Sequence, residues 1–270
     1  MVKVWRSLVY LAALLTFGSL FLTIGFILVQ GLPHLKLDLF AVTYSSDNMS
    51  LFPAIVTTLI LVVVSLLIAV PLGVFAGFYL VEYAKRGSKV VGLIRLAADT
   101  LQGVPSIVFG LFGMLFFVVF CGFQYSLLSG ILTSVIMVLP LIIRATEEGL
   151  LSVPDSVRQA SLALGAGKLR TTVTVVLPEA LPGILAGVLL SIGRIIGETA
   201  ALMYTLGSST NLPTSLMASG RSLALHMYVL SSEGLYLDQA YATGVILMLT
   251  VLLLNVLSSR LSKRLMKGKS

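Results

Sequence analysis

Six long apolar segments constrain this chain most. They cover residues 9–29, 54–81, 105–120, 127–143, 183–203 and 242–257. A stretch of about 17–25 apolar residues crosses a hydrocarbon core about 30 Å thick. Charged residues make up only 11% of the 270 residues, whereas soluble domains carry about 25%. The sequence therefore predicts an all-α membrane protein with six transmembrane helices, in which the second segment is long and the third and fourth are short.

The N-terminal segment resembles a signal peptide, because Lys3 and Arg6 precede its apolar run. However, the run exceeds the apolar core of about 7–15 residues found in signal peptides, and it contains no Ala-x-Ala cleavage site. We therefore expect a retained anchor helix. The single cysteine, Cys121, excludes an internal disulfide framework and a cysteine metal site.

The basic residues predict how the chain crosses the membrane. If the N-terminus lies inside, fifteen of the eighteen lysines and arginines fall in cytoplasmic segments. Lys36 and Arg221 then lie outside, and Arg194 lies within a span. This bias predicts that both termini are cytoplasmic. It also accounts for the net charge of +7 without any nucleic acid partner.

The same reading divides the chain into parts. Residues 1–50 form an anchor helix and a first external loop, residues 51–259 form a five-helix core with a cytoplasmic loop at 144–182, and residues 260–270 form a basic tail beside anionic membrane lipid. Within the core, we expect an interfacial helix at 93–104 leading into the third span. The external segment 204–241 is expected to carry a short surface helix at 222–230.

The cytoplasmic loop between the fourth and fifth spans has a regular pattern. Pro154 followed by Asp155 predicts a helix start, and Gly165 can adopt the left-handed conformation that ends a helix. One face of this helix is expected to carry Val157, Ala160, Ser161 and Leu164, with Arg158 and Gln159 facing elsewhere. A second helix is expected to start at 170–176, before Pro178 and Pro182 break the chain. Such a loop can dock into a partner's groove or rest on lipid headgroups, and the periodicity alone favours neither.

The spacing of seven residues in this loop resembles a known family pattern. The pattern Glu-Ala-Ala-x3-Gly-x9-Ile-x-Leu-Pro of type I ABC importer membrane subunits is matched by Gln159, Ala160, Ser161, Gly165, Val175, Leu177 and Pro178. The departures are Gln for Glu, Ser for the second Ala and Val for Ile. The resemblance implies the type I ABC importer permease fold and a coupling helix, including Leu164, that docks on a separate ATPase subunit.

This loop also contains a fragment that looks like a phosphate-binding P-loop, at residues 165–168. The full motif is Gly-x4-Gly-Lys followed by Ser or Thr, but Leu162 and Leu169 occupy the positions that must be Gly and Ser or Thr. We therefore expect no catalytic residue, no metal and no cofactor in this chain, with ATP bound by the partner ATPase.

The fifth span contains two charged residues, Arg194 and Glu198. Each costs roughly 2.5–3.5 kcal/mol when placed alone at the centre of a bilayer. In one continuous helix they share a stripe of small residues, so they can form an ion pair that locks helices together. Alternatively, Arg194 is a station for an anion, held and partly neutralised by Glu198, because the arginine fork matches phosphate or carboxylate oxygens.

Arg144, at the cytoplasmic end of the fourth span, is by position alone an interface anchor. A second resemblance covers nearly the whole chain and adds another interpretation. The stretches 105–113, 153–155 and 194–200 are similar to those of phosphate-specific ABC permeases. That family places arginines in the phosphate path, which implies such a role for Arg144 and Arg194, with Glu198 as the partner of the second.

Together these resemblances predict a permease subunit that carries inorganic phosphate across a bacterial inner membrane. The implied partners are a second, related permease subunit, two ATPase subunits and an extracytoplasmic phosphate-binding protein. Two alternatives stay open. One is a type I importer permease for another oxyanion such as phosphonate, sulfate or molybdate, and the other is an ion-coupled secondary transporter.

Overall fold

The computed structural model describes residues 2–85, 87–234 and 236–267, and the side chains within 5–260 of these ranges. In this part of the chain every regular element is a helix. The elements are α1 (Val2–Gly31), η1 (Leu32–His34), η2 (Leu37–Phe40), α2 (Phe52–Phe78), η3 (Tyr79–Tyr83), α3 (Lys89–Gly103), α4 (Ser106–Gly113), η4 (Met114–Phe120), α5 (Leu127–Leu151), α6 (Asp155–Ala163), α7 (Lys168–Thr171), η5 (Thr172–Val176), α8 (Leu177–Ile196), α9 (Ala200–Met203), α10 (Leu223–Glu233) and α11 (Leu237–Lys267). The predicted basic tail after residue 260 lies outside the residues whose side chains are described.

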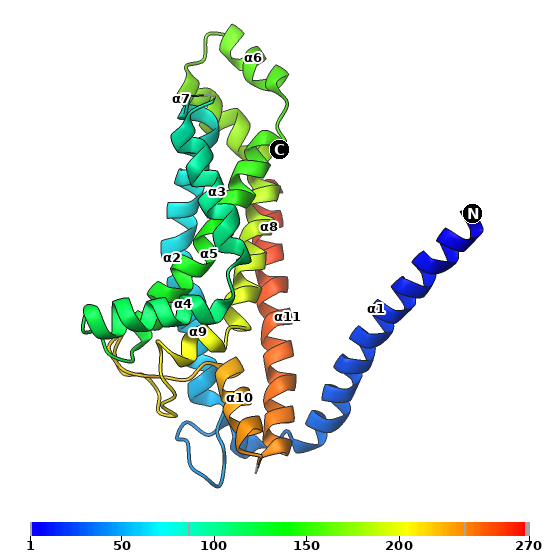
Figure 1. The fold of residues 1–270 in the computed structure, drawn as a ribbon, viewed down its shortest axis with the longest axis vertical. Coiled ribbons are helices and arrows are strands. Elements are labelled where there is room, and N and C mark those ends of the chain that lie inside the picture. The colour runs from blue at the N-terminus through cyan, green and yellow to red at the C-terminus, as the bar shows by residue number, and fades with distance from the viewer. Residues whose placement is uncertain (1, 86, 235, 268–270) are drawn as a thin grey trace.

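Five stretches of the described chain are long and apolar enough to cross a membrane on their own. They are Trp5–His34, Phe52–Tyr83, Leu127–Leu151, Lys168–Ile196 and Leu237–Arg260. A sixth crossing is possible only if α3 and the unit α4–η4 are counted together. Figure 1 shows α2, α3, α5, α8 and α11 running side by side along the long axis, with α6 at one end and α10 near the other.

The third predicted span differs most from the structure. We expected an interfacial helix at 93–104 leading into a span at 105–120, but α3 runs along the bundle (Figure 1), and α3 and α4–η4 meet at an angle of 104°. Figure 1 shows α3 along the bundle and α4 lying across it. The corner forms at Val104 and Pro105, both extended, because a proline disfavours the helical conformation of the residue before it.

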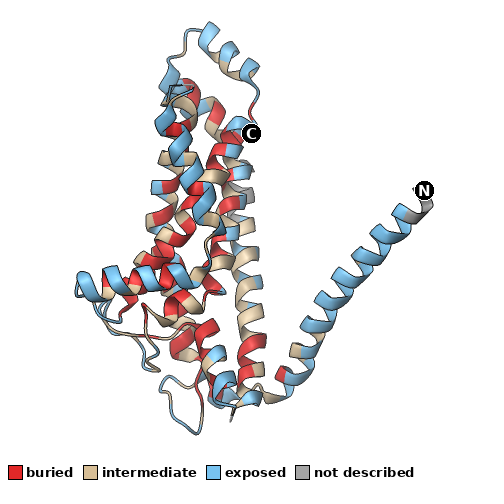
Figure 2. Cartoon of the chain, in the orientation of Figure 1, coloured by how far each residue is buried: buried red, intermediate tan, exposed pale blue. Residues whose placement is uncertain are grey.

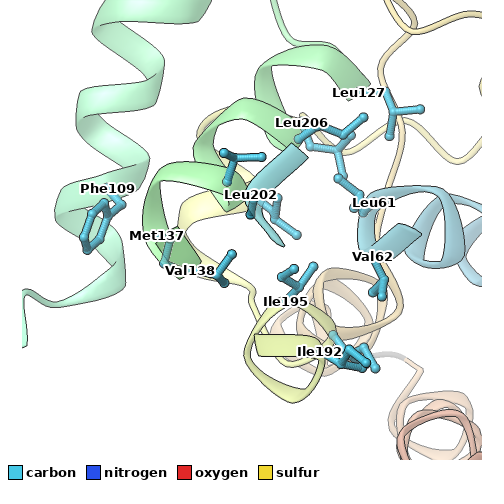
Figure 3. Close-up of a cluster of buried hydrophobic side chains, with 14 of the residues drawn as sticks. Leu61, Val62, Phe109, Leu127, Met137, Val138, Ile192, Ile195, Leu202 and Leu206 are labelled. Carbon is cyan, nitrogen blue, oxygen red and sulfur yellow. The ribbon is translucent and has the colours of Figure 1, made fainter. Parts of the chain in front are cut away.

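The apolar core lies where α2, α5 and α8 meet. Leu61 of α2, Val138 of α5 and Ile195 of α8 are each at most 1% exposed, and Figure 3 shows them pointing toward one another. The short helix α9 adds Leu202 to the same cluster. In Figure 2 buried residues follow these central helices, whereas α1 is exposed along most of its length.

Small residues bring α5 and α8 into close contact. A Cβ built on Gly149 of α5 would lie 3.0 Å from the carbonyl oxygen of Ala180, and one built on Gly187 of α8 would collide with the Cβ of Ala145. Lipid tails are as apolar as leucine, so association within a membrane depends on such close packing. The contact holds α5 and α8 together as one pair. Because the cytoplasmic loop begins after α5 and leads into α8, this pair holds the two ends of the loop together.

We expect Gly187→Leu to destabilise the bundle, because the new side chain must displace Ala145 and separate α5 from α8. Overpacking of this kind costs about 1–3 kcal/mol. Gly193→Leu is the matched control on the same helix, since nothing lies within 4 Å of a Cβ at that position. Thermal unfolding in detergent should show a lower Tm for Gly187→Leu alone, and equal Tm values for both variants would contradict the packing argument.

Helix α1 leaves the bundle. None of the residues in its most apolar window is buried, and Figure 1 shows it diverging from α11 toward the level of the α6 end. The two helices meet near Gly31, where an added Cβ would lie 2.6 Å from a side-chain methyl of Val245. An apolar helix exposed on all sides is compatible with lipid or with a second membrane subunit around it.

At the end opposite α6, the predicted surface helix at 222–230 is confirmed as α10. Ser222 caps it, accepting a hydrogen bond from the Leu225 amide. His226 is 1% exposed and its ring lies edge-on to that of Tyr44, while its Nε2 atom has no hydrogen-bond partner in the described chain. Burial, together with the nearby Arg221 charge, lowers the pKa of His226 to about 4.

This buried histidine predicts a loss of stability in acid. The unfolded chain takes up its proton near pH 6.5, whereas the folded chain does so only near pH 4. Protonation therefore favours the unfolded state, and the free energy of unfolding should decrease as the pH falls from about 6.5 to 4. We expect His226→Gln to flatten the decrease in Tm between pH 7.5 and 5. An unchanged slope would contradict the assignment of this loss of stability to His226.

Candidate functional site

The cytoplasmic loop folds as the spacing predicts at both ends of its first helix. Helix α6 begins at Asp155 after Pro154 and ends at Ala163. Gly165 has φ +83, and its amide donates to the Leu162 carbonyl while the Ala166 amide donates to the Ser161 carbonyl. These two bonds form a Schellman motif, which requires the left-handed residue at its centre.

The faces of α6 differ in part from the prediction. The four residues expected on one face do not share one environment: Val157 and Ser161 are half-buried against the rest of the chain, whereas Ala160 is exposed and Leu164 is 89% exposed. Gln159 is also exposed. The outer face of α6 and the turn after it therefore offer small and apolar side chains to a partner, whereas the inner face is occupied by contacts within the chain.

The inner face also holds Arg158, which we predicted to point elsewhere. Its side chain is 16% exposed and its Nε donates to the Glu82 carboxylate of η3 at 3.1 Å. Its two Nη atoms donate to the carbonyls of Leu150 and Val153, each at 2.6 Å. Helical periodicity could not identify the inward position of this arginine, because Glu82 is 76 residues away in sequence and two further partners are backbone atoms.

The second half of the loop does not break as predicted. Helices α7, η5 and α8 form one continuous span, Lys168–Ile196, although Pro178 and Pro182 lie within it. Pro178 has no amide hydrogen, so it cannot donate a hydrogen bond to the carbonyl four residues earlier. In the π-helical turn η5, which directly precedes α8, each amide pairs instead with the carbonyl five residues earlier. Val175, Leu177 and Pro178 are half-buried, and Ser161 is hydrogen-bonded to Thr171 at 2.9 Å, so α6 is held to this span.

Arg194 and Glu198 do not form the predicted pair. Helix α8 ends at Ile196, so Arg194 lies in its last turn and Glu198 lies beyond it. The Glu198 carboxylate is buried and accepts a hydrogen bond from the Ala201 amide, at the start of α9. The single stripe of residues 183–205 that we expected is therefore interrupted at Gly197, and Glu198 serves the next helix.

Arg194 is the less constrained of the two charges. It is half-buried, and within the described chain no hydrogen bond or ion pair to it is found. An arginine in an apolar span without a counter-charge is costly. The position therefore fits either a ligand or a charge supplied by another subunit.

Arg144 has the opposite character. It lies within α5, and its guanidinium pairs with Glu147 at 3.1 Å, Asp99 of α3 at 3.3 Å and Glu148 at 3.4 Å. Arg95 of α3 also pairs with Glu147, which is almost fully buried. Three carboxylates thus compete for Arg144, and the cluster holds α3 against α5.

The two arginines lie at different depths. Ala145 contacts Gly187, so Arg144 lies near the level of Gly187, and Arg194 follows seven residues later on α8. At 1.5 Å per residue this places Arg194 about 10 Å farther from the α6 end. The structure therefore has an unpaired arginine deep in the bundle and a carboxylate-bound arginine nearer to α6.

Residues 69–269 match the family model described as binding-protein-dependent transport system inner membrane component. The chain is 36% identical over 209 residues to a probable ABC transporter permease protein, YqgI, of Bacillus subtilis, covering 72% of this chain and 71% of that protein. It is 35% identical over 229 residues to the phosphate transport system permease protein PstA of Xylella fastidiosa, covering 84% and 79%. It is 43% identical over 162 residues to PstA 1 of Mycobacterium tuberculosis, covering 60% and 52%.

Among solved structures, the chain resembles a subunit of a bacterial alginate ABC transporter in complex with an alginate-bound periplasmic protein. The TM-score is 0.69 at 16% identity, over 98% of this chain and 97% of that one. The inward-facing MetNI methionine ABC transporter gives a TM-score of 0.57 at 19% identity, over 82% and 94%. At these identities the likeness concerns the fold.

Proposed function

Because the chain belongs to the family of binding-protein-dependent transport system inner membrane components, we propose that it is a permease subunit carrying inorganic phosphate across the plasma membrane. The chain spans the membrane several times, has the type I ABC importer permease fold, and is not itself an enzyme. Relatives named phosphate transport permeases support phosphate as the cargo. The observation that carries the proposal is the unpaired, half-buried Arg194 on α8.

Arginine suits a reversible phosphate station. Its five donors are held in a planar fork that can bind two phosphate oxygens at once. Since Glu198 is engaged by the Ala201 amide, it does not neutralise Arg194 in this structure. Arg144, about 10 Å nearer to α6, is surrounded by carboxylates. A phosphate arriving there is repelled by those carboxylates, which favours its release on the α6 side.

Three surfaces support the proposed partners. The outer face of α6 and the turn after it offer Ala160 and Leu164 to an ATPase subunit. Helix α1 exposes its apolar faces to lipid and to a second, related permease subunit. The loops near α10 face the opposite end, where a phosphate-binding protein would deliver its cargo. When the end that carries α6 is placed in the cytoplasm, the first residues of α1 and the last residues of α11 are also directed toward the cytoplasm (Figure 1), as the basic residues predict.

Co-purification and reconstitution test this function. Complexes purified through this chain should contain an ATPase and a second membrane subunit. In liposomes supplied with a phosphate-binding protein and ATP, they should accumulate labelled phosphate but not sulfate or molybdate. Accumulation without any ATPase would indicate a secondary transporter, and preference for another oxyanion would overturn the cargo assignment while leaving the family intact.

A further inference from the structure

Helix α6 is separated from the end of α2 by a cavity of about 970 Å³. Glu82, Arg95, Asp155 and Arg158 are among the residues that line it. Val157 of α6 and Val81 of η3 both pack against one apolar cluster around Leu150 and Val153, and polar side chains make a second connection beside the cavity. Arg158 crosses this gap, and its guanidinium contacts Glu82 of η3 and two carbonyls at the end of α5, besides Asp155 on α6 itself.

Two of the contacts complete the end of α5. Pro154 has no amide hydrogen, so it cannot donate to the Leu150 carbonyl in the usual helical pairing. Besides a 3.4 Å hydrogen bond from the Val153 amide, the Leu150 carbonyl accepts one from Arg158, which also donates to the Val153 carbonyl, each at 2.6 Å. A cation at this position is also favoured by the helix dipole of α5.

The third contact reaches a different helix. Arg158 Nε donates to Glu82 at 3.1 Å, and Glu82 is only 9% exposed. Glu82 belongs to η3, which continues α2 directly. A pair this far from water is much less screened than a surface ion pair, so separating its members is costly. A second link is parallel to it, since the Lys168 ammonium lies 5.0 Å from the centre of the Tyr83 ring.

We propose that Arg158 is a positioning residue that makes α2 follow the coupling helix. This inference rests on the proposed function, in which α6 moves with the ATPase. When α6 is displaced, Arg158 moves the end of α5 through two carbonyls and the end of α2 through Glu82. Motion therefore enters the bundle on two helices besides α8, which follows α6 along the chain.

The variant Glu82→Gln tests the link to α2 alone. It leaves the contacts of Arg158 with Leu150 and Val153 in place, so α5 keeps its cap. We expect phosphate transported per ATP hydrolysed to fall about two- to thirtyfold, the range seen for residues that carry coupling between sites. ATPase binding and the amount of assembled complex should stay at parent levels.

Asp155→Asn is the matched control. Asp155 also pairs with Arg158, at 3.4 Å, but it lies on α6 itself and is 66% exposed. Its loss removes a carboxylate near the same guanidinium but leaves the Arg158–Glu82 link between helices in place. We expect the transport ratio of Asp155→Asn to equal that of the parent. Equal losses in both variants would show that only the charge balance around Arg158 matters, and would overturn the proposal.

Spin labels test the Arg158–Glu82 link without a transport measurement. With the single cysteine replaced, Cys121→Ser, labels at Ser156 of α6 and at exposed Tyr79 of η3 report the α6–α2 distance in the ATPase-bound complex. Glu82→Gln should broaden the distance distribution, whereas Asp155→Asn should not. An unchanged distribution in Glu82→Gln overturns the link. A parent complex that shows the link but moves no phosphate contradicts the proposed function instead.

Discussion

Replacing Arg194 with glutamine should abolish phosphate uptake while leaving the complex assembled. Two charge-assisted hydrogen bonds to a phosphate are lost, together worth about 3 kcal/mol or more. This corresponds to roughly a hundredfold weaker binding. Assembly should survive because removing an unpaired charge from an apolar span relieves its burial cost. Uptake of labelled phosphate, normalised to the amount of purified complex, measures the effect.

Two variants separate binding from structure. Arg194→Lys keeps the charge but loses the planar fork, so uptake should be intermediate and should need a higher phosphate concentration. Lys36→Gln removes an exposed cation outside the span and should leave uptake unchanged. If Arg194→Gln instead reduces the yield of complex while each remaining complex transports normally, the arginine is a structural partner for another subunit.

The sequence predicted the membrane class and the geometry of the coupling helix, for a physical reason. Both depend on local patterns, namely apolar length and a helix bounded by Pro154 and Gly165, which the structure confirms. Six apolar segments do not, however, specify six straight helices. Pro105 favours a break after Val104, but the 104° angle of that bend and the end of α8 at Ile196 depend on how these segments pack, and composition carries little information about that.

The contacts of the charged residues were even harder to predict from local sequence patterns. The i, i+4 spacing of Arg194 and Glu198 assumes one continuous helix, and the structure ends the helix between them. Arg144 pairs with Glu147 and Glu148 of its own helix, but its third partner, Asp99, comes from α3 and is distant in sequence. Arg158 was expected only to face away from Val157 and Ser161, because helical periodicity cannot indicate a partner as distant in sequence as Glu82. Partners on other helices require the fold.

The turn after α6 gives the second large effect. We expect Gly165→Val to uncouple ATP hydrolysis from transport. At φ +83 a β-branched residue is strongly strained, and even a simple side chain costs about 1–2 kcal/mol in the left-handed region. The Schellman motif then opens, and α6 loses its fixed angle to α7 while the Ser161–Thr171 hydrogen bond is stretched. ATP hydrolysed per phosphate transported should increase about tenfold.

We expect the backbone conformation at residue 165, and not the size of the new side chain, to cause the uncoupling. Nothing lies within 4 Å of a Cβ at Gly165 or at Gly167, so neither position is crowded within the chain. Gly167 has φ −69 and ψ 159, which valine adopts readily. Gly167→Val should therefore couple normally, and Gly165→Asn should retain most coupling because asparagine tolerates the left-handed region. If Gly167→Val uncouples as strongly as Gly165→Val, the loop needs small residues against the ATPase, and the angle set by the turn is not what transmits the motion.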